Sequence, residues 1–446
     1  MTSSKECFAI ATAAFIAVLA ICLGGVVNGQ PSDDKAAIVA GATYRVGPSR
    51  EYKDINAVTA LVKPGDTIEV DGDANYPSVI FRQSGTADKP ITIRGIRVNG
   101  KRPVISGGTN TVEFRLSNYN VFEGFEVTGG KNRGLYHHAA FITVRDTFVH
   151  DCPGQGITGS DQDSGSLLLE YSEVARCGGG MYSHPIYMST DPQAYPGSVF
   201  RMQFCYIHDG TGGNAVKSRS ERNELYYNWI ESGFYREIEL IGRDIEAAPR
   251  PMNSDVVGNV FFKTSQYPVA RIGHDSKGLG TRGRYRFVNN TFVLSPEASV
   301  AIQAYGKLES VEMHNNVFYR KGGGVVRVLN EEDAEWTTGK RVCSGERNWV
   351  VTGSDCPDEW KGTLDGLDPR FVNIGSANLA PAAESPLINE GTMTPASPEG
   401  FPFPNALFPP AFEPMIRAVA PTSGATARKV VGAIDIGAFE AASGGK

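Results

Sequence analysis

The stretches that decide the fold are five short segments in which an asparagine stands two residues before a large apolar residue. They read YNWI (227–230), GNVF (258–261), NNTF (289–292), NNVF (315–318) and RNWV (347–350). Side-chain amides that stack at one turn of every coil can hydrogen-bond to each other and to the turn backbone. A column of asparagines repeated in this way indicates a chain that winds into equivalent coils.

The apolar residue of each segment marks a slot that continues toward the N-terminus. The slots follow one another at steps of 22 to 33 residues: Val127, Val149, Val174, Ile207, Ile230, Phe261, Phe292, Phe318 and Val350. Repeats of this length, rich in short strands and polar at the turns, are typical of solenoids. We predict an all-β fold, a single-stranded right-handed parallel β-helix, whose long strand faces suit a linear polymer.

The composition agrees with one elongated domain. The 446 residues include 51 glycines, which suit many short strands and tight turns. The net charge of −6 and the pI near 5.8 argue against nucleic acid as a partner. An acidic polysaccharide is compatible with these values, since a local basic cleft can lie on an acidic protein. We expect a monomer.

The chain divides into three parts. Residues 1–30 contain a continuous apolar run and read as a secretory signal peptide, with an uncleaved N-terminal anchor as the alternative. Residues 31–359 are assigned to the β-helix, and residues 360–446 form a proline-rich tail. After the first part nothing is long and apolar enough to span a membrane, so we expect a secreted or periplasmic protein.

Both ends of the β-helix need a cover for the open core. Residues 50–62 are expected to form a short capping helix, because Ile55, Val58, Leu61 and Val62 follow a helical spacing. The tail of residues 360–446 is expected to pack along the coils as an extended segment, since its prolines exclude it from central strands. The alternative is a disordered tail.

Five cysteines remain after the first thirty residues. Cys152 and Cys177 each stand three residues after a slot, at equivalent positions of adjacent coils, and neighbouring strands are about 4.8 Å apart. This spacing is compatible with a disulfide, which we predict between them. Cys343 and Cys356 are expected to close a second loop. Cys205 lies in a core strand and is expected to be a buried free thiol.

The second strand of each coil concentrates the residues suited to chemistry. If the apolar residues of these strands point inward, alternation places Tyr187, Lys217 and Glu239 outward on three successive coils, about 4.8 Å apart. Arg271 joins this row if the register of the next coil shifts by one residue. Glu237 is expected to point the same way as Glu239.

Several segments resemble secreted β-helix proteins of the pectin lyase-like fold that include alginate lyases and chondroitinase B. The opening coils carry GDTIEV (65–70) and SGTADKPITIRG (84–95), and the end carries DPRFVN (368–373), SPLINEG (385–391) and DIGAFE (435–440). NAVKSRSERNELYYNWIES (214–232) resembles the stretch that bears the catalytic lysine of that family. The resemblance covers most of residues 60–440.

The resemblance implies a polysaccharide lyase that acts by β-elimination on a uronic-acid polymer. It places the catalytic base on Lys217, and like charge from nearby arginines would favour the neutral amine that a base needs. The family has a catalytic arginine in a strand that reads IELIG (238–242) here, so Arg271 is the proposed substitute, with Arg219, Arg236 and Arg243 as others. His184 and Arg219 flank the row and complete the expected catalytic set.

Substrate and metal contacts are expected around the same row. Tyr187, Glu239, Arg243 and His274 are the expected substrate-binding residues. A calcium ion is the one cofactor considered, with Glu237, Glu239 and Asp244 as its oxygen ligands, because such sites suit exported proteins.

Other interpretations of the same residues stay open. Lys217 and Glu239 also fit a surface ion pair, which contributes little to stability. His184 fits a turn residue, and the repeated pairs His150–Asp151 and His208–Asp209 fit turn chemistry. For the whole chain the alternatives are a uronate epimerase, a glycan-binding protein without catalysis, and a glycoside hydrolase, which needs two carboxylates about 5–9.5 Å apart.

Overall fold

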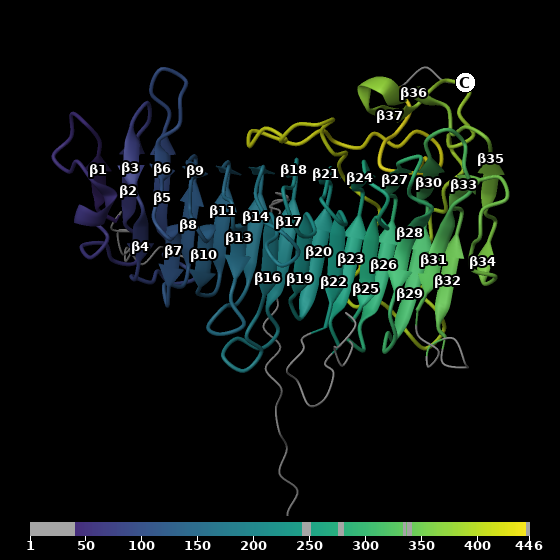
Figure 1. The fold of residues 1–446 in the computed structure, drawn as a ribbon, viewed down its shortest axis with the longest axis horizontal. Coiled ribbons are helices and arrows are strands. Elements are labelled where there is room, and N and C mark those ends of the chain that lie inside the picture. Colours follow the sequence, from purple (N-terminus) through teal and green to yellow (C-terminus); the bar gives the residue numbers. More distant parts are fainter. Residues whose placement is uncertain (1–40, 243–250, 275–280, 333–335, 337–340, 443–446) are drawn as a thin grey trace, which may run out of the picture. The chain divides into compact units, whose positions relative to one another are not determined.

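The computed structural model describes residues 41–242, 251–274, 281–332, 336 and 341–442. They form a right-handed parallel β-helix in which each coil contributes one strand to each of three long parallel sheets (Figure 1). We call these sheets A, B and C, in the order in which the chain visits them within a coil. Over the described residues they contain 13, 12 and 10 strands, respectively.

The strands are short and, from β2 to β33, follow one another in rotation through sheets A, B and C. Sheet A contains β1 (Thr43–Val46), β2 (Thr67–Asp71), β5 (Ile91–Ile96), β8 (Asn120–Glu123), β11 (Ile142–Arg145), β14 (Leu167–Glu170), β17 (Val199–Gln203), β20 (Arg222–Tyr226), β23 (Asn253–Val257), β26 (Arg284–Val288), β29 (Ser310–His314), β32 (Cys343–Glu346) and β34 (Trp360–Lys361). Sheet B contains β3 (Asn75–Pro77), β6 (Val104–Ser106), β9 (Glu126–Thr128), β12 (Phe148–His150), β15 (Glu173–Ala175), β18 (Tyr206–His208), β21 (Trp229–Glu231), β24 (Val260–Phe262), β27 (Thr291–Leu294), β30 (Val317–Arg320), β33 (Trp349–Val351) and β35 (Leu364–Gly366). Sheet C contains β4 (Val79–Phe81), β7 (Asn110–Arg115), β10 (Arg133–His138), β13 (Gln155–Gly159), β16 (Ile186–Ser189), β19 (Val216–Arg219), β22 (Ile238–Ile241), β25 (Ala270–Gly273), β28 (Val300–Ala304) and β31 (Arg327–Glu331).

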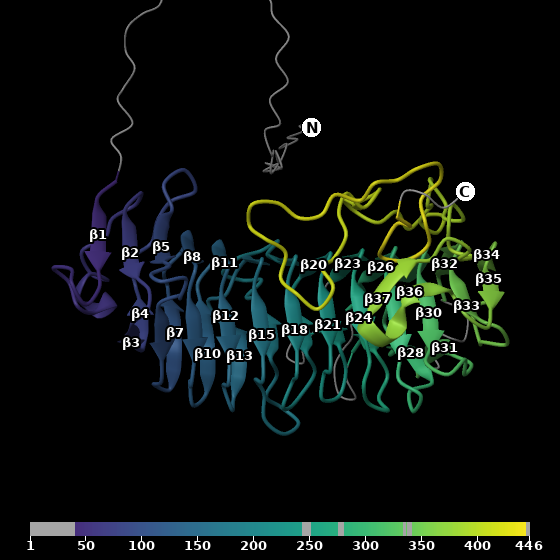
Figure 2. The same ribbon diagram turned by 90° about the horizontal axis from the view of Figure 1, so that it is seen from above.

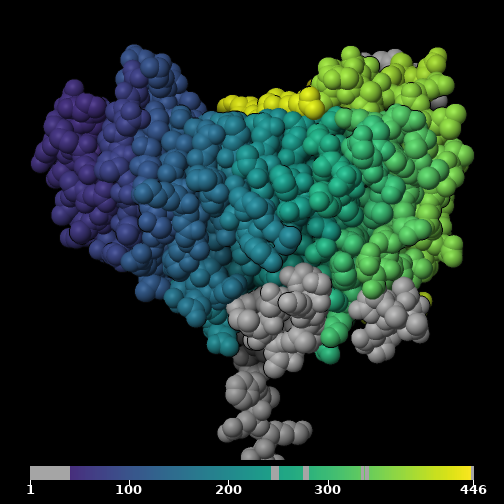
Figure 3. Space-filling view, in the orientation of Figure 1, coloured from purple at the N-terminus to yellow at the C-terminus, as the bar shows by residue number. Residues whose placement is uncertain are grey.

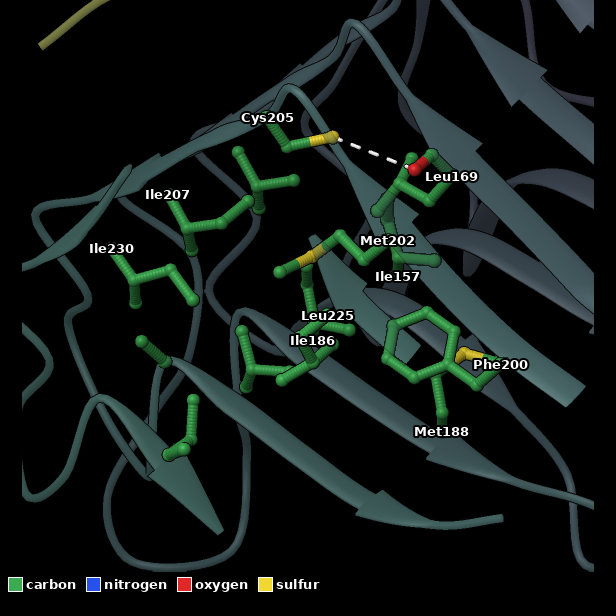
Figure 4. Close-up of a cluster of buried hydrophobic side chains, with 14 of the residues drawn as sticks. Ile157, Leu169, Ile186, Met188, Phe200, Met202, Cys205, Ile207, Leu225 and Ile230 are labelled. Atoms are coloured by element: carbon green, nitrogen blue, oxygen red, sulfur yellow. Dashed lines mark hydrogen bonds between the residues drawn. The ribbon is translucent and has the colours of Figure 1, made fainter. Parts of the chain in front are cut away.

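The slots predicted from the sequence are the inward positions of sheet B. The slot residues of successive coils lie opposite each other in register, as Ile207 does with Ile230 and Phe261 with Phe292. The rings of Phe261 and Phe292 are 4.8 Å apart, which is the strand spacing. Figure 4 shows the same core in the coils that precede these phenylalanines, where Ile207 and Ile230 meet residues from the other two sheets. The interior is therefore a continuous apolar column.

The asparagine column is the hydrogen-bonded ladder that its spacing indicated. The side-chain amide of Asn290 donates to the Oδ1 atom of Asn316 at 2.9 Å and to the carbonyl of Val256 at 2.8 Å. Its own Oδ1 accepts from the backbone and side chain of Asn259, at 3.0 Å each. The five ladder asparagines are fully buried, so these bonds satisfy polar groups that would otherwise be costly to bury.

The predicted capping helix is wrong, because the segment does not form an α-helix. Residues 50–62 contain only a 3₁₀ turn, η1 (Ile55–Ala57), whose N-cap is Asp54. Ile55 is buried against the core as expected, but Leu61 is 43% exposed. Pro64 follows closely and disfavours a helical conformation at the residue before it, so the segment covers the core without completing an α-helix.

The two predicted disulfides are not formed, and the five cysteines of the described residues are free thiols. Cys152 and Cys177 do lie at equivalent positions of adjacent coils, where the thiol of Cys177 reaches the carbonyl of Val149 on the coil before it at 3.9 Å. Each thiol also contacts the carbonyl two residues before it, at 3.4 and 3.3 Å. Cys343 lies in sheet A, whereas Cys356 follows a bridge to sheet C, so the two belong to different walls. Cys205 is a buried free thiol, as predicted.

The tail first extends the stack, because β34 and β35 add one strand each to sheets A and B. Beyond Gly366 it packs on the coils instead (Figure 2). It forms a small antiparallel pair, β36 (Phe371–Asn373) and β37 (Asn378–Pro381), joined by the 3₁₀ turn η2 (Ile374–Ser376). η2 and later segments lie against the C-terminal half of sheet B. Leu379 and Phe439 cover the outward residues Trp229 and Val260. Figure 3 shows the tail, in green and yellow, along one edge of the stack.

Among the residues that the structure describes, no helix is long and apolar enough to cross a membrane. The apolar run near the N-terminus lies outside the described residues.

Candidate functional site

The outer face of sheet C carries the row of polar residues predicted from strand alternation. Tyr187 pairs in register with Lys217, Lys217 with Glu239, and Glu239 with Arg271. Arg271 therefore joins the row without any shift of register. The same column continues to Gln303 of β28. Five adjacent strands thus present five polar or aromatic side chains in one line along the stack.

Glu239 is the carboxylate at the centre of this row. It accepts hydrogen bonds or ion pairs from Lys217 at 3.0 Å, from Arg271 at 3.1 Å and from the side-chain amide of Asn214 at 2.8 Å. Its side chain is 3% exposed. Burial alone would raise the pKa of Glu239, but the charges of Lys217 and Arg271 outweigh it and hold the pKa below its usual value. Glu239 is therefore ionised.

Arg236 adds a third cation beside the row. It lies at the corner before β22 and donates to the Oε1 atom of Gln303 at 2.7 Å, an atom that Arg271 also approaches at 3.4 Å. Burial, aided by the charge of Arg271, lowers the pKa of Arg236 to about 10, so it stays protonated at neutral pH. Three cations, Lys217, Arg236 and Arg271, thus face one carboxylate, and the local charge is positive on an acidic protein.

His184 is buried beside Tyr187, and the two rings are 5.4 Å apart. Its Nδ1 atom accepts the backbone N–H of Asn214 at 2.8 Å, so the Nε2 atom carries the proton of the neutral ring. Burial, aided by the charge of Lys217, lowers the pKa of His184 to about 4. At neutral pH His184 is therefore a hydrogen-bond donor and not a base.

Of the remaining predicted residues, Arg219 and His274 lie beside the row. Arg219 is buried at the end of β19 and donates to the carbonyl of Gly242 on the next coil, so it ties two coils together. His274 packs at 5.4 Å from Tyr305, whose ring Arg271 contacts at 4.9 Å. Arg243 and Asp244 lie outside the described residues.

Glu237 does not lie with Glu239, which corrects the prediction. It stands in the corner before β22, where the alternation of the strand has not begun, and it is fully buried. There it accepts from the backbone N–H of Gly233 at 3.3 Å and contacts Lys263, also fully buried, at 3.2 Å. Burial raises the pKa of Glu237 to about 7.

The expected calcium site is not assembled by the two glutamates that the structure describes. Glu237 faces Lys263, and the oxygens of Glu239 are taken by cationic and amide donors, which a divalent cation would have to displace. Among the described residues there is no group of three or more histidine, cysteine, aspartate or glutamate side chains suited to hold a metal ion.

Sequence reasoning missed two residues that bind the charged side chains of the row. Asn214 comes from a corner between sheets B and C and donates to Glu239. Gln303 lies in β28, and applying the same alternation to VAIQA (300–304) would have found it. On the corners between sheets B and C, Tyr182 is 81% exposed and Phe234 is 47% exposed.

Comparisons with known proteins support the fold. No family model and no curated protein matches this chain. Among solved structures it is similar to the pectate lyase Pel9A, with 14% identity, 91% of this chain and 98% of that chain covered, and a TM-score of 0.50. It also matches an alginate lyase from Paenibacillus sp. str. FPU-7, with 17% identity, coverage of 64% and 95%, and a TM-score of 0.46. A third match is the GH136 lacto-N-biosidase from Eubacterium ramulus, with 11% identity, coverage of 73% and 68%, and a TM-score of 0.43. At these identities the likeness shows the parallel β-helix alone.

Proposed function

We propose that the protein binds an acidic polysaccharide along the outer face of sheet C and cleaves it by β-elimination. The observation that carries this proposal is the set of three cations, Lys217, Arg236 and Arg271, around the single buried carboxylate Glu239. This set leaves excess positive charge on a strand face that runs along the coils, although the whole chain has a net charge of −6. A uronate polymer offers the complementary charge at every sugar.

Each residue has a part in this proposal. Arg271 and Arg236 neutralise the carboxylate of the bound uronate, which acidifies the adjacent C–H bond. Lys217, as the free amine, takes that proton; the carbon–carbon double bond forms as the bond to the leaving oxygen breaks. Tyr187, the neighbour of Lys217 in the row, protonates the leaving oxygen. His184 donates a hydrogen bond from Nε2 and positions Tyr187 or the sugar.

The exposed rings of the corners support a polysaccharide over a small anion. Tyr182 and Phe234 project from the turns that lead into β16 and β22, on one side of the row. Tyr235 packs edge-on between Phe234 and Tyr267, at 4.9 and 5.0 Å. Aromatic rings offer flat apolar surfaces with polar rims, which suit the faces of sugar rings.

A second candidate function is binding without cleavage. The specific observation in its favour is the ion pair of Lys217 with Glu239, which engages the nitrogen that elimination would use as its base. The glycoside hydrolase alternative has less support. Of the described carboxylates, Glu239 in the row is already bound by cations, Glu332 contacts the row only through Gln303 at its end, and Glu237 faces Lys263.

The test uses the purified protein with alginate, chondroitin and dermatan sulfates, pectate and bacterial exopolysaccharides, with and without calcium. The readout is the ultraviolet absorbance of the unsaturated product that elimination alone forms. We expect a rise on one polymer that Lys217→Ala reduces about 100-fold or more. Binding to a polymer without any rise in absorbance would instead establish the second candidate function.

A further inference from the structure

A hollow of about 420 Å³ lies on a different wall from the row, near the N-terminal end of the stack. Its sides are the loop between β5 and β6, which supplies Arg97, Lys101 and Arg102, and the outer face of sheet B, which supplies Glu126 and Phe148. This loop projects from the stack beside β6 (Figure 1). The volume falls within the range of sites for small ligands, which is about 300–1,000 Å³.

The three cations of this loop differ in how firmly neighbouring carboxylates hold them. Arg102 is held by Asp146, at 2.5 Å from its carboxylate and through its backbone carbonyl, and is 18% exposed. Arg97 reaches the same carboxylate only at 3.4 Å and is 46% exposed. Lys101 pairs with Asp73 at 2.8 Å but remains 70% exposed. Arg97 and Lys101 are therefore the cations available to a ligand, since exposed ion pairs are weak.

Phe148 supplies an apolar surface whose position is fixed. Its ring stacks on His150 at 4.1 Å, and both nitrogens of His150 are held by carboxylates, Asp151 at 2.5 Å and Glu126 at 3.0 Å. A ring supported in this way does not have to be ordered when a ligand binds. The hollow thus combines two available cations, two carboxylates, Asp73 and Glu126, and one fixed aromatic ring.

The arrangement around Phe148 recurs two coils farther along. Tyr206 stacks on His208 at 4.0 Å, and His208 is held by Asp209 at 2.8 Å and by Glu173 at 3.0 Å. At this point the tail begins to cover sheet B, because Glu231 binds both Tyr206, at 2.7 Å, and Arg417 of the tail, at 2.8 Å. The outer face of sheet B is therefore open between the projecting loop and the tail. In Figure 3 both rise from the same edge, with lower surface between them.

We propose that this hollow is a second carbohydrate site, which binds a carboxylated sugar apart from the row of sheet C. Arg97 and Lys101 bind the sugar carboxylate, Glu126 accepts from its hydroxyl groups, and the ring of Phe148 receives its apolar face. The site performs no chemistry. It holds an acidic polymer on the protein whether or not the row of sheet C is occupied. It does not depend on cleavage at Lys217.

The test is the number of binding sites per chain, measured by isothermal titration calorimetry with a tetramer of galacturonic acid and one of mannuronic acid. We expect two sites in the wild-type protein. The double variant Arg97→Ser/Lys101→Ser should retain one, and Lys217→Ala/Arg271→Ala should retain the other. Arg45→Ser is the matched control, since Arg45 is 60% exposed in an ion pair on sheet A. It should retain both sites.

The outcomes separate this inference from the proposed function. A single site that is lost in Arg97→Ser/Lys101→Ser would support the hollow and contradict binding at the row. A number of sites that Arg97→Ser/Lys101→Ser leaves unchanged would overturn the inference, whatever the row does. Both are overturned if neither acid tetramer binds. The two substitutions are at exposed side chains, so thermal unfolding should match that of Arg45→Ser.

Discussion

Lys217 and Glu239 lie opposite each other on adjacent strands of sheet C, and their side chains form an ion pair of 3.0 Å. Arg271 approaches the same carboxylate from the other side, at 3.1 Å. The carboxylate therefore joins the two cations and offsets part of their positive charge.

Substitution of Glu239 should strengthen the binding of an acidic polysaccharide. Although burial raises it, the charges of Lys217 and Arg271 hold the pKa of Glu239 below its usual value, so the carboxylate is ionised at neutral pH and offsets part of the positive charge around it. In Glu239→Gln the three cations remain without this carboxylate. We expect a lower dissociation constant in calorimetry and a steeper loss of affinity with added salt. Glu123→Gln on sheet A, whose partner is Arg94 at 2.6 Å, is the control and should leave the affinity unchanged.

Alternation and spacing were sufficient to predict the coils and the row. The slot pattern predicted the inward positions of Ile207, Ile230 and the stacked phenylalanines. It succeeded because each coil of a solenoid packs only on its neighbours, so the same inward position recurs in every coil. The same rule placed Lys217 and Glu239 on one face. These features depend on regular strands, in which side-chain direction follows from the position in the chain.

The corners between strands could not be predicted in this way. Glu237 is two residues before Glu239, yet it turns toward Gly233 and Lys263 in the buried corner, because the strand begins only at Ile238. The pairing of Glu237 with Lys263 joins residues on successive coils through irregular backbone, and no local pattern indicates it. Cys152 and Cys177 show a second limit of prediction from spacing. Their equivalent positions place the two thiols on adjacent coils, but the spacing does not determine whether a disulfide forms.

The asparagine ladder should contribute to stability at every rung. Asn290→Ala removes two donated and two accepted hydrogen bonds and leaves the carbonyl of Val256 without its donor in a buried site. We expect a loss of about 3 kcal/mol in the free energy of unfolding, measured with urea. Asn132→Ala is the control, because Asn132 is exposed. An equal effect of the two substitutions would contradict a stabilising ladder.

Buried histidines should make the protein less stable in acid. His137 in β10 is fully buried, its Nδ1 atom contacts the carbonyl of Ala139 at 3.1 Å, and burial lowers its pKa to about 4. Because the pKa is lower in the folded state than the usual 6.5, the contribution of His137 is complete above pH 6.5 and is lost as the pH falls through about 4. The loss is about 3 kcal/mol. His137→Gln should flatten the fall of unfolding free energy between pH 6.5 and 4.

The contribution of His208 to stability should depend on pH in the opposite sense, so His208 serves as the comparison. Burial opposes its protonation, but the hydrogen bonds to Glu173 and Asp209 outweigh burial and raise its pKa. Its contribution is therefore complete below pH 6.5 and is lost as the pH rises through the raised value. His208→Gln should leave the acid side of the profile as steep as in the wild-type protein. A flattening by His208→Gln alone would contradict these assignments.

The buried pair of Glu237 and Lys263 should hold the corner that carries Arg236. Lys263 donates to the carbonyls of Gly233 and Tyr235 as well as to Glu237, so it binds the corner at three points. Lys263→Met removes one partner of a fully buried ion pair and should cost about 3–5 kcal/mol in the free energy of unfolding. Lys89→Met at an exposed position is the control and should have little effect.

The double variant Lys263→Met/Glu237→Leu separates stability from positioning. Replacing both charges by apolar side chains of similar volume should restore most of the lost stability, since no charge is left buried without a partner. The corner, however, loses the two hydrogen bonds that Lys263 donates to the carbonyls of Gly233 and Tyr235, and Arg236 is no longer held toward Gln303. We therefore expect near wild-type thermal unfolding together with at least about tenfold weaker binding of the acidic polysaccharide, or about 1.4 kcal/mol. Restored stability with unchanged affinity would show that the pair serves the fold and not the site.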